Sequence, residues 1–328
     1  MRRIHPAPSS FVDPKTGAPA FGSYEGPLPR VDLGAIGLRD RIARRKRWVY
    51  LALASDEVWI SIGVVRTGYA TTAFGFAFDR KTRAMLVDRT VIAPHATASI
   101  ADDLHASGDV TRFAFLRSKV SVVRRAGELD VTARFKGLEV AATLDEQAAP
   151  PPITAIAGLG DGLLDATEKR ALAKVKGTAT CDGRTFDLAS AVGGYDYTHG
   201  LLPRHTCWRW AFGLGRTAEN EPIGFNVVEG FVGEAECAAF YEGALHPISE
   251  PKFSFDIDRP LDPWRLKGEG IDLTFDPGAV HAQHTQLVVV KSRFVQPVGV
   301  FKGTLRIGER DVVLDEVPGV VEDQDVLW

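Results

Sequence analysis

The feature that most constrains this fold is a repeat of the chain's own sequence at a spacing of 126 residues. Lys176-Gly177-Thr178 matches Lys302-Gly303-Thr304 at that spacing. The matches continue without a gap through Arg184 and Arg310, Leu188 and Leu314, Gly193 and Gly319, and Asp196 and Glu322. Repeated units bury their apolar faces in the same way, so the chain is predicted to contain two copies of one fold.

A second and looser repeat lies upstream of the first. Trp48-Val49-Tyr50, followed by Ile62-Gly63, parallels Trp208-Arg209-Trp210, followed by Ile223-Gly224. Each half therefore begins with an aromatic-x-aromatic segment and ends with a Lys-Gly-Thr segment, a hairpin and a Gly-x-x-acid turn. Because residues two apart share one face of a strand, each aromatic pair is predicted to face a barrel interior or a cavity.

Most of the chain has the composition of short β-strands. From Trp48 to about Asp145, and again after Lys176, runs rich in Val, Ile, Phe, Leu and Thr alternate with Gly and Asp turns. These runs have the length of antiparallel strands, and they follow one another without helical crossovers. The pattern predicts a mainly β fold in which antiparallel meanders close into barrels.

Helical patterns are brief. Residues 37–47 are predicted to form one short helix. A second is predicted from Asp165 to Lys176, because Asp165 and Glu168 have the spacing of a capping box. We therefore expect an N-terminal arm with a short helix at residues 1–46, a first barrel at 47–195 and a second barrel at 196–328.

Composition excludes several classes of partner. The net charge of −3 gives no general attraction to nucleic acid or to an anionic membrane surface. No apolar run approaches the length of a membrane span, and residues 1–10 lack the apolar core of a signal peptide. We therefore expect a cytoplasmic protein without an integral membrane segment. The three cysteines are too few for a disulfide framework, and no pair has metal-ligand spacing.

Two further motifs have a stronger structural than functional interpretation. Gly158-x-Gly160-x-Gly162 resembles part of a dinucleotide-binding loop but lacks a βαβ context. His281-x-x-His284 offers two metal-ligating side chains without a third in view. We therefore expect no cofactor and no metal. The sequence does not indicate an oligomeric state.

The densest group of polar and aromatic side chains lies at the junction of the two repeats, from Gly193 to Trp210. Asp196, beside His199 and Arg204, could act as a general acid whose pKa is raised by burial. The alternative is an ordered interdomain loop in which Asp196 caps backbone amides and Arg204 pairs with an acid. We take Asp196, His199 and Arg204 as the candidate catalytic residues.

Other side chains are candidates for contact with a ligand. Asn226 lies in an apolar strand, where it needs hydrogen-bond partners if it is buried. Glu322 is either a second carboxylate that faces Asp196 across a pseudo-twofold axis or part of a solvated acidic tail. The candidate substrate-binding residues are Tyr197, Trp208, Trp210, Asn226, Glu229 and Glu322.

A series of short motifs spans residues 48 to 328. They are Trp48-x-Tyr50, Thr167-x-Lys169, Asp196-Tyr197-Thr198-x-Gly200, Trp208-x-Trp210-Ala211, Gly224-x-Asn226, Pro263-Trp264, Phe275-x-Pro277 and Gly319-x-x-Glu322. In this order they resemble the bacterial family of unknown function DUF2804. The resemblance covers nearly the whole folded chain and implies no particular activity.

More distantly, residues 196–200 and Trp208-x-Trp210 are similar to the Asp-His-Glu-Trp-Gly and Trp-Asp-Trp motifs of the carotenoid hydratase and AttH-like group. That resemblance implies two tandem lipocalin-like antiparallel β-barrels with a pocket at or near their junction. It places Asp196 at the group's carboxylate, and Trp208 and Trp210 at its tryptophans. Residues 197–199 replace the group's His-Glu-Trp, and Arg209 replaces its second acid, so the resemblance implies the architecture rather than a shared mechanism.

These observations predict a protein that binds a hydrophobic small molecule, such as an isoprenoid, a polyketide or a lipid, near the barrel junction. One hypothesis is an enzyme in which Asp196 protonates that molecule for hydration, isomerisation or cyclisation, while aromatic rings stabilise positive charge. The alternative is a non-catalytic lipid carrier or sensor, and a third reading is an interaction module with filled barrels. Replacement of Asp196 by Asn would abolish turnover under the first hypothesis and change only affinity under the second.

Overall fold

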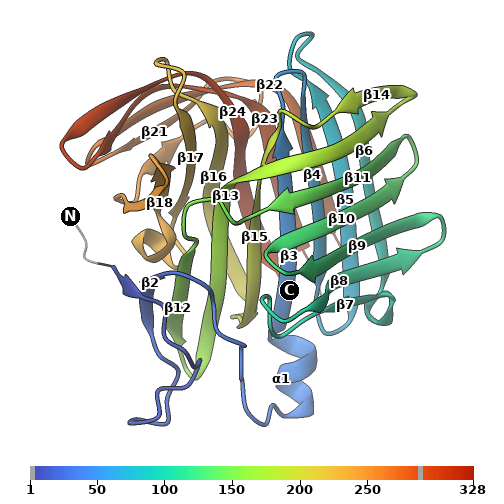
Figure 1. The fold of residues 1–328 in the computed structure, drawn as a ribbon. Coiled ribbons are helices and arrows are strands. Elements are labelled where there is room, and N and C mark those ends of the chain that lie inside the picture. The colour runs from blue at the N-terminus through green and yellow to red at the C-terminus, as the bar shows by residue number, and fades with distance from the viewer. Residues whose placement is uncertain (1–3, 287–290) are drawn as a thin grey trace.

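The computed structural model describes residues 4–286 and 291–328. Its strands form two strongly curled, largely antiparallel sheets, one drawn mainly in blue and green and the other in orange and red (Figure 1). A short helix, α1 (Leu38–Ala43), precedes the first long strand, and two 3-10 turns, η1 (His95–Thr97) and η2 (Gly233–Glu236), lie in loops. The predicted mainly β, lipocalin-like fold is confirmed.

The first sheet has the strand order β6-β5-β4-β3-β15-β13-β11-β10-β9-β8-β7, and four short strands pair at its margins. Its main strands are β3 (Arg45–Ala54), β4 (Val58–Arg66), β5 (Ala70–Asp79), β6 (Ala84–Pro94), β7 (Ala98–Ile100), β8 (Gly108–Phe115), β9 (Ser118–Arg125), β10 (Glu128–Phe135), β11 (Leu138–Asp145), β13 (Leu163–Cys181) and β15 (Val192–Leu201). The marginal strands are β1 (His5–Pro6), β2 (Gly22–Glu25), β12 (Ile153–Gly160) and β14 (Arg184–Asp187).

The second sheet has the strand order β19-β18-β17-β16-β24-β23-β22-β21-β20. Its strands are β16 (His205–Arg216), β17 (Pro222–Glu229), β18 (Ala238–Tyr241), β19 (Ala244–Pro247), β20 (Lys252–Ser254), β21 (Trp264–Gly268), β22 (Ile271–Gln286), β23 (Lys291–Ile307) and β24 (Arg310–Leu327). The chain therefore leaves the first sheet at Leu201 and enters the second at His205, and the boundary expected at residue 195 falls inside β15.

Strand β10 illustrates why these segments form strands. Leu129, Val131 and Phe135 are buried, whereas Thr132 and Arg134 are exposed. This period of two matches the pleat, so one face of the strand packs into the core while the other meets water. Strand β15 differs because both of its faces are covered, and residues 193–200 are all buried.

The helix predicted from Asp165 to Lys176 is wrong. These residues belong to the long strand β13, which pairs with β12, β11 and β15. The helix-forming side chains of this segment reflect only a weak local preference, and pairing with three strands overrides it. The register shifts between Arg170 and Ala173, where Leu172 has a φ of 63°.

The sequence repeat marks one backbone feature in both sheets. Gly177 in β13 has a φ of 132°, and Gly303 in β23 has a φ of 127°. A Cβ at Gly177 would overlap the carbonyl oxygen of Ala141, and one at Gly303 would overlap that of Asp272. Both sites combine a left-handed backbone with a close approach to the neighbouring strand, so glycine is required in each. The duplication predicted from the Lys-Gly-Thr motifs is therefore visible in the strands that carry them.

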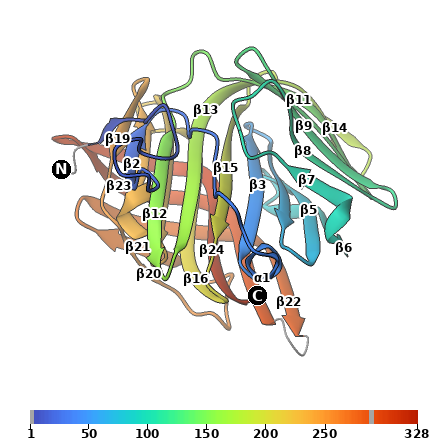
Figure 2. The same cartoon turned by 90° about the horizontal axis from the view of Figure 1, so that it is seen from below.

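The N-terminal arm packs against the first sheet. Strand β2 pairs with β12, and Phe11, Leu28 and Val31 join the buried core of that sheet. The arm crosses the sheet on its way to α1, as the view from below shows (Figure 2). The helix predicted over residues 37–47 forms only from Leu38 to Ala43, because residues 45–47 belong to β3, and Leu38 and Ile42 are exposed. No helix in residues 4–286 and 291–328 is long and apolar enough to cross a membrane.

Buried apolar side chains form two clusters. The first fills the space enclosed by the first sheet, from β3 round to β11. The second joins the opposite face of β3 and β5, through Tyr50 and Phe76, to Trp210 and Phe212 of the second sheet. Strands β13 and β15 of the first sheet pack against β16 and β17 of the second, and β6 packs against β22. The candidate site lies within this junction.

Candidate functional site

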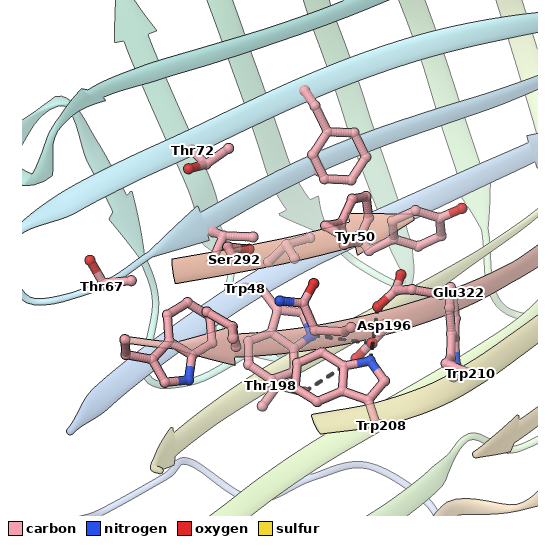
Figure 3. Close-up of a pocket in the computed structure, with 18 of the residues that line it drawn as sticks. Trp48, Tyr50, Thr67, Thr72, Asp196, Thr198, Trp208, Trp210, Ser292 and Glu322 are labelled. Carbon is pink, nitrogen blue, oxygen red and sulfur yellow. Dashed lines mark hydrogen bonds between the residues drawn. The ribbon is translucent and has the colours of Figure 1, made fainter. Parts of the chain in front are cut away.

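A cavity of about 360 Å³ opens between the two sheets (Figure 3). Most of its wall is apolar and aromatic, and its aromatic members are Trp48, Tyr50, Tyr69, Phe74, Trp208, Trp210, Phe231, Phe294 and Trp328. Five ionisable side chains also line it, namely Asp165, Lys169, Asp196, Glu236 and Glu322. This volume and mixture are typical of sites for small organic molecules.

The first carboxylate of the cavity, Asp196, lies on β15. The register places it opposite Lys169 of β13 on one side and Tyr50 of β3 on the other. The ammonium of Lys169 lies 2.5 Å from Asp196 Oδ1, and the indole of Trp48 donates a hydrogen bond of 3.1 Å to Oδ2. The hydroxyl of Thr198 donates to Oδ1 at 3.3 Å. Asp196 is thus held as an ion-paired carboxylate.

The second carboxyl, Glu322, lies on β24 at the position that the repeat matches to Asp196. It pairs in register with Trp210 of β16. The indole of Trp208 donates to Oε1 at 2.8 Å, and the amide of Gln296 donates to Oε2 at 2.7 Å. Each half of the molecule therefore presents one carboxyl that accepts a hydrogen bond from a tryptophan of the neighbouring strand (Figure 3).

Besides the tryptophan, the two carboxyls have different partners. Asp196 contacts the ammonium of Lys169, whereas Glu322 contacts the neutral amide of Gln296. Burial raises the pKa of Glu322 to about 7, the hydrogen bonds from Trp208 and Gln296 oppose that rise, and the charge of Asp196 adds to it. Glu322 is therefore partly protonated near neutral pH, and the neighbouring Asp196 is ion-paired with Lys169.

Two more buried carboxyls share the same lysine. Glu236 Oε2 lies 3.2 Å from the ammonium of Lys169, and burial raises the pKa of Glu236. Burial raises the pKa of Asp165 well above its ordinary value, and the charge of Glu236 adds to the effect. Among the described residues, Asp165 Oδ1 has no hydrogen-bond partner. Burial alone would lower the pKa of Lys169, but Asp196 and Glu236 raise it above its ordinary value, so the lysine stays charged.

Aromatic side chains from the two halves meet in pairs. The rings of Trp48 and Trp208 stack with centroids 5.8 Å apart, and Tyr50 meets Trp210 edge to face at 5.2 Å. The indole of Trp210 donates to Asn226 Oδ1 at 2.7 Å. Such rings present negative π faces that attract positive charge. The cavity therefore combines a proton donor, an ion-paired carboxylate and several π faces.

The sequence of residues 6–328 matches the family described as "Domain of unknown function (DUF2804)". The chain belongs to this family. The membership predicted from the short motifs is thus confirmed. No curated protein sequence matches the chain.

Solved structures share the fold of this DUF2804 protein at low sequence identity. CghA with Sch210972 is 12% identical, with a TM-score of 0.55, and the alignment covers 98% of this chain and 97% of that one. Kievitone hydratase from Nectria haematococca is 13% identical, with a TM-score of 0.49 and coverage of 92% and 97%. A putative AttH from Nitrosomonas europaea is 12% identical, with a TM-score of 0.44 and coverage of 91% and 98%. At these identities the likeness concerns the fold alone.

Four of the nine candidate catalytic and substrate-binding residues line the cavity of the DUF2804 protein, namely Asp196, Trp208, Trp210 and Glu322. Trp48 and Tyr50, the other predicted aromatic pair, line it as well. Asn226 lies behind the wall, where its Nδ2 donates to the carbonyl of Glu236 at 2.8 Å while its Oδ1 holds Trp210. It therefore joins a wall residue to the loop that carries Glu236.

The other candidates lie elsewhere. Tyr197 and His199 alternate with Asp196 along β15, so they point to the opposite face of the sheet. Tyr197 donates to the carbonyl of Ala101 at 2.7 Å. Arg204 is an exposed residue between β15 and β16. Glu229 lies outside the cavity, where it accepts a hydrogen bond from a backbone amide in β20.

Sequence reasoning missed Lys169, Asp165 and Glu236. The sequence predicted a helix for Asp165 and Lys169. In the strand that forms instead, alternate residues share one face, so both residues lie on the same face of β13. The polar pattern Asp165-x-Thr167-x-Lys169 inside an apolar segment carried that signal. Glu236 gave no local signal, because it reaches the site from η2 only in the folded chain.

The weak motifs have structural roles. Gly158 and Gly160 lie at the end of β12. His281 Nδ1 lies 2.7 Å from Asp88 Oδ1, and the side chain of His284 falls outside the described residues. Within the described part of the chain, no group of three or more His, Cys, Asp or Glu side chains could hold a metal ion.

Proposed function

We propose that this protein binds a hydrophobic small molecule between its two sheets and protonates it with Glu322. The reaction would be an acid-assisted hydration, isomerisation or cyclisation of an unsaturated compound such as an isoprenoid or a polyketide. The observation that carries the proposal is a buried carboxyl with a pKa of about 7 that faces an aromatic cavity beside an ion-paired carboxylate.

The arrangement assigns different tasks to the two carboxyls. A general acid works best when its pKa lies near the working pH, which fits Glu322. Asp196, paired with Lys169, would stabilise positive charge on the substrate. Pairs of acids whose environments separate their pKa values are typical of sites that divide acid and base roles. The sequence pointed to Asp196 as the acid, and the contacts favour Glu322.

The proposed chemistry begins with transfer of the Glu322 proton to one carbon of a substrate double bond. The O–H bond breaks, a C–H bond forms, and positive charge develops at the neighbouring carbon. The π faces of Trp48, Trp208 and Trp210 would stabilise that charge. Water then adds to the cation, a ring closes, or a different proton leaves, and the acid is reprotonated from solvent.

The first experiment is native mass spectrometry of the gently purified protein, followed by solvent extraction of the bound compound. That compound, or its commercial analogues, is then incubated with the protein in deuterated water. Protonation at carbon adds a deuteron, so turnover is read as a mass increase in the recovered compound. We expect incorporation with the wild-type protein and none with Glu322→Gln.

Glu229→Gln is a matched control, because it removes a carboxylate of the second sheet that does not line the cavity. Binding without deuterium incorporation by the wild-type protein would instead favour the carrier or sensor. The structure of CghA, which shares this fold, is described with Sch210972, and this supports a ligand-binding role. Equal incorporation by Glu322→Gln and the control would refute the role proposed for Glu322.

A further inference from the structure

A second cavity, of about 440 Å³, lies under the N-terminal arm. Its wall includes Ser9, Ser10 and Arg30 from the arm, and Arg45, Asp102 and His199 from the body. His199 and Asp196 point to opposite faces of β15, and each lines a different cavity. The second cavity is therefore separated from the candidate active site by a strand, and its lining is polar where that of the first is aromatic.

Positive charge is concentrated beside this cavity. Burial, together with the charges of Arg45 and Arg66, lowers the pKa of Arg47 to about 10. Asp102 pairs with Arg45 at 2.9 Å and with Arg47 at 2.8 Å. Within the described residues, Asp102 is the carboxylate that forms ion pairs with Arg45 and Arg47, and Asp32 is a second carboxylate in the cavity wall.

His199 adds a hydrogen-bond donor to the same place. Its ring is fully buried, and its Nε2 accepts a hydrogen bond from Arg45 Nε at 3.0 Å. The ring proton therefore lies on Nδ1. Burial lowers the pKa of His199 well below its ordinary value, and Arg45 and Arg47 lower it further, so the ring is neutral. Among the described residues, Nδ1 has no hydrogen-bond partner.

Asp102 Oδ1 lies 3.7 Å from Nδ1, which is too far for a hydrogen bond. A buried donor without an acceptor is costly. An oxygen anion in the cavity would accept from Nδ1 and offset the charge of Arg45 at once. We propose that this second cavity binds a small oxyanion, a carboxylate or a phosphate group, held by His199 Nδ1 and Arg45. Arginine is well suited to both groups because its planar fork matches their oxygens.

The arm closes the site from above. The amide of Val31 donates to the carbonyl of Asp102 at 2.8 Å, which holds the arm against the body at the cavity wall. Arg30 precedes this anchor and faces the cavity from the arm side. A bound oxyanion would therefore contact arm and body together, and its binding would fasten the arm to the first sheet.

The test is calorimetric titration of the whole chain with sodium phosphate and, separately, sodium acetate, at an ionic strength held constant with sodium chloride. We expect saturable binding of at least one probe. Binding of phosphate would indicate a site for a phosphate group, and binding of acetate alone would indicate a site for a carboxylate. Arg45→Gln should weaken binding at least tenfold, and Arg45→Lys should lose less. Arg117→Gln, which removes an exposed arginine that does not line the cavity, should bind as the wild type does.

If Arg45→Gln fails to fold, Arg30→Gln is the variant to test in its place, because Arg30 is exposed on the arm. It should also weaken binding, and the Nδ1 proton signal of His199 should shift in the NMR spectrum as the probe is added. The absence of saturable binding of both probes to the wild type would overturn the proposal. So would an affinity of Arg45→Gln or Arg30→Gln equal to that of the Arg117→Gln control.

Discussion

Replacement of Glu322 by Gln should change how the stability of the protein depends on pH. The carboxyl of Glu322 is buried and has a folded-state pKa of about 7, against an ordinary value of 4.5. Glutamine keeps the shape of the side chain and an oxygen that can accept from Trp208, and it does not titrate. The comparison of the two proteins therefore isolates the ionisation of one group and its coupling to Asp196.

The sign follows from which state binds the proton. Below pH 4.5 the carboxyl is protonated in both folded and unfolded chains. Between 4.5 and about 7 the unfolded chain releases the proton while the folded chain keeps it, so the stability of the wild type falls as pH rises. Above a pH of about 7 the carboxyl is ionised in both states, so the stability of the wild type falls no further through this group. The gap in pKa corresponds to about 3 kcal/mol, since one pKa unit is about 1.36 kcal/mol.

Urea unfolding followed by circular dichroism, at intervals from pH 4.5 to pH 8, measures this effect. The free energy of unfolding of Glu322→Gln minus that of the wild type should rise by about 3 kcal/mol across the range. Glu229→Gln reports the background of removing another carboxylate of the second sheet. A difference that stays flat, or that falls as pH rises, would show that Glu322 does not hold its proton in the folded protein.

Three further results are expected. Lys169→Met should destabilise the protein by about 3–5 kcal/mol, because it removes the ammonium that pairs with buried carboxylates. Lys302→Met, which removes an exposed ion pair, should lower the free energy of unfolding far less in the same urea assay. Gly177→Ala and Gly303→Ala should each lower the melting temperature by a similar amount, because both positions combine a left-handed backbone with a close approach to the neighbouring strand. An unchanged melting temperature for only one of the two variants would contradict their equivalence. Deuterium incorporation should fall as pH rises through about 7, because Glu322 loses the proton it donates, and a rate that rises through this range would contradict its role as the acid.

The sequence predicted the class of fold because its signals were local. A strand such as β10 shows its buried and exposed faces in its own alternation. The repeat was equally visible, because the same backbone demand selects glycine at both Gly177 and Gly303. The same reasoning failed for the segment from Asp165 to Lys176, for which it predicted a helix. Its side chains favour a helix, and the segment becomes a strand only through pairing with the preceding strand β12 and with the more distant β11 and β15.

The candidate site was predictable to the extent that the repeat reached it. The match of Asp196 to Glu322 identified two carboxyls that both line the cavity. Nearness in sequence misled elsewhere, because Tyr197 and His199 adjoin these positions in β15 yet face the other way. Lys169 was missed because only the pairing of β13 with β15 places it opposite Asp196.

The duplicated halves explain how one site came to hold two unlike carboxyls. Trp48 and Trp208 donate to Asp196 and Glu322 in the same manner, so the tryptophans cannot make the carboxyls differ. The difference comes from β13 and β23, which supply a lysine in one half and the neutral amide of Gln296 in the other. The charged partner gives Asp196 an ion pair, whereas the neutral partner of Glu322 leaves the effect of burial largely unopposed, and burial raises the pKa of Glu322 to about 7. A symmetric pair of like charges would repel, whereas this asymmetry pairs one carboxyl with a cation and, under the proposed function, leaves the other able to carry a transferable proton.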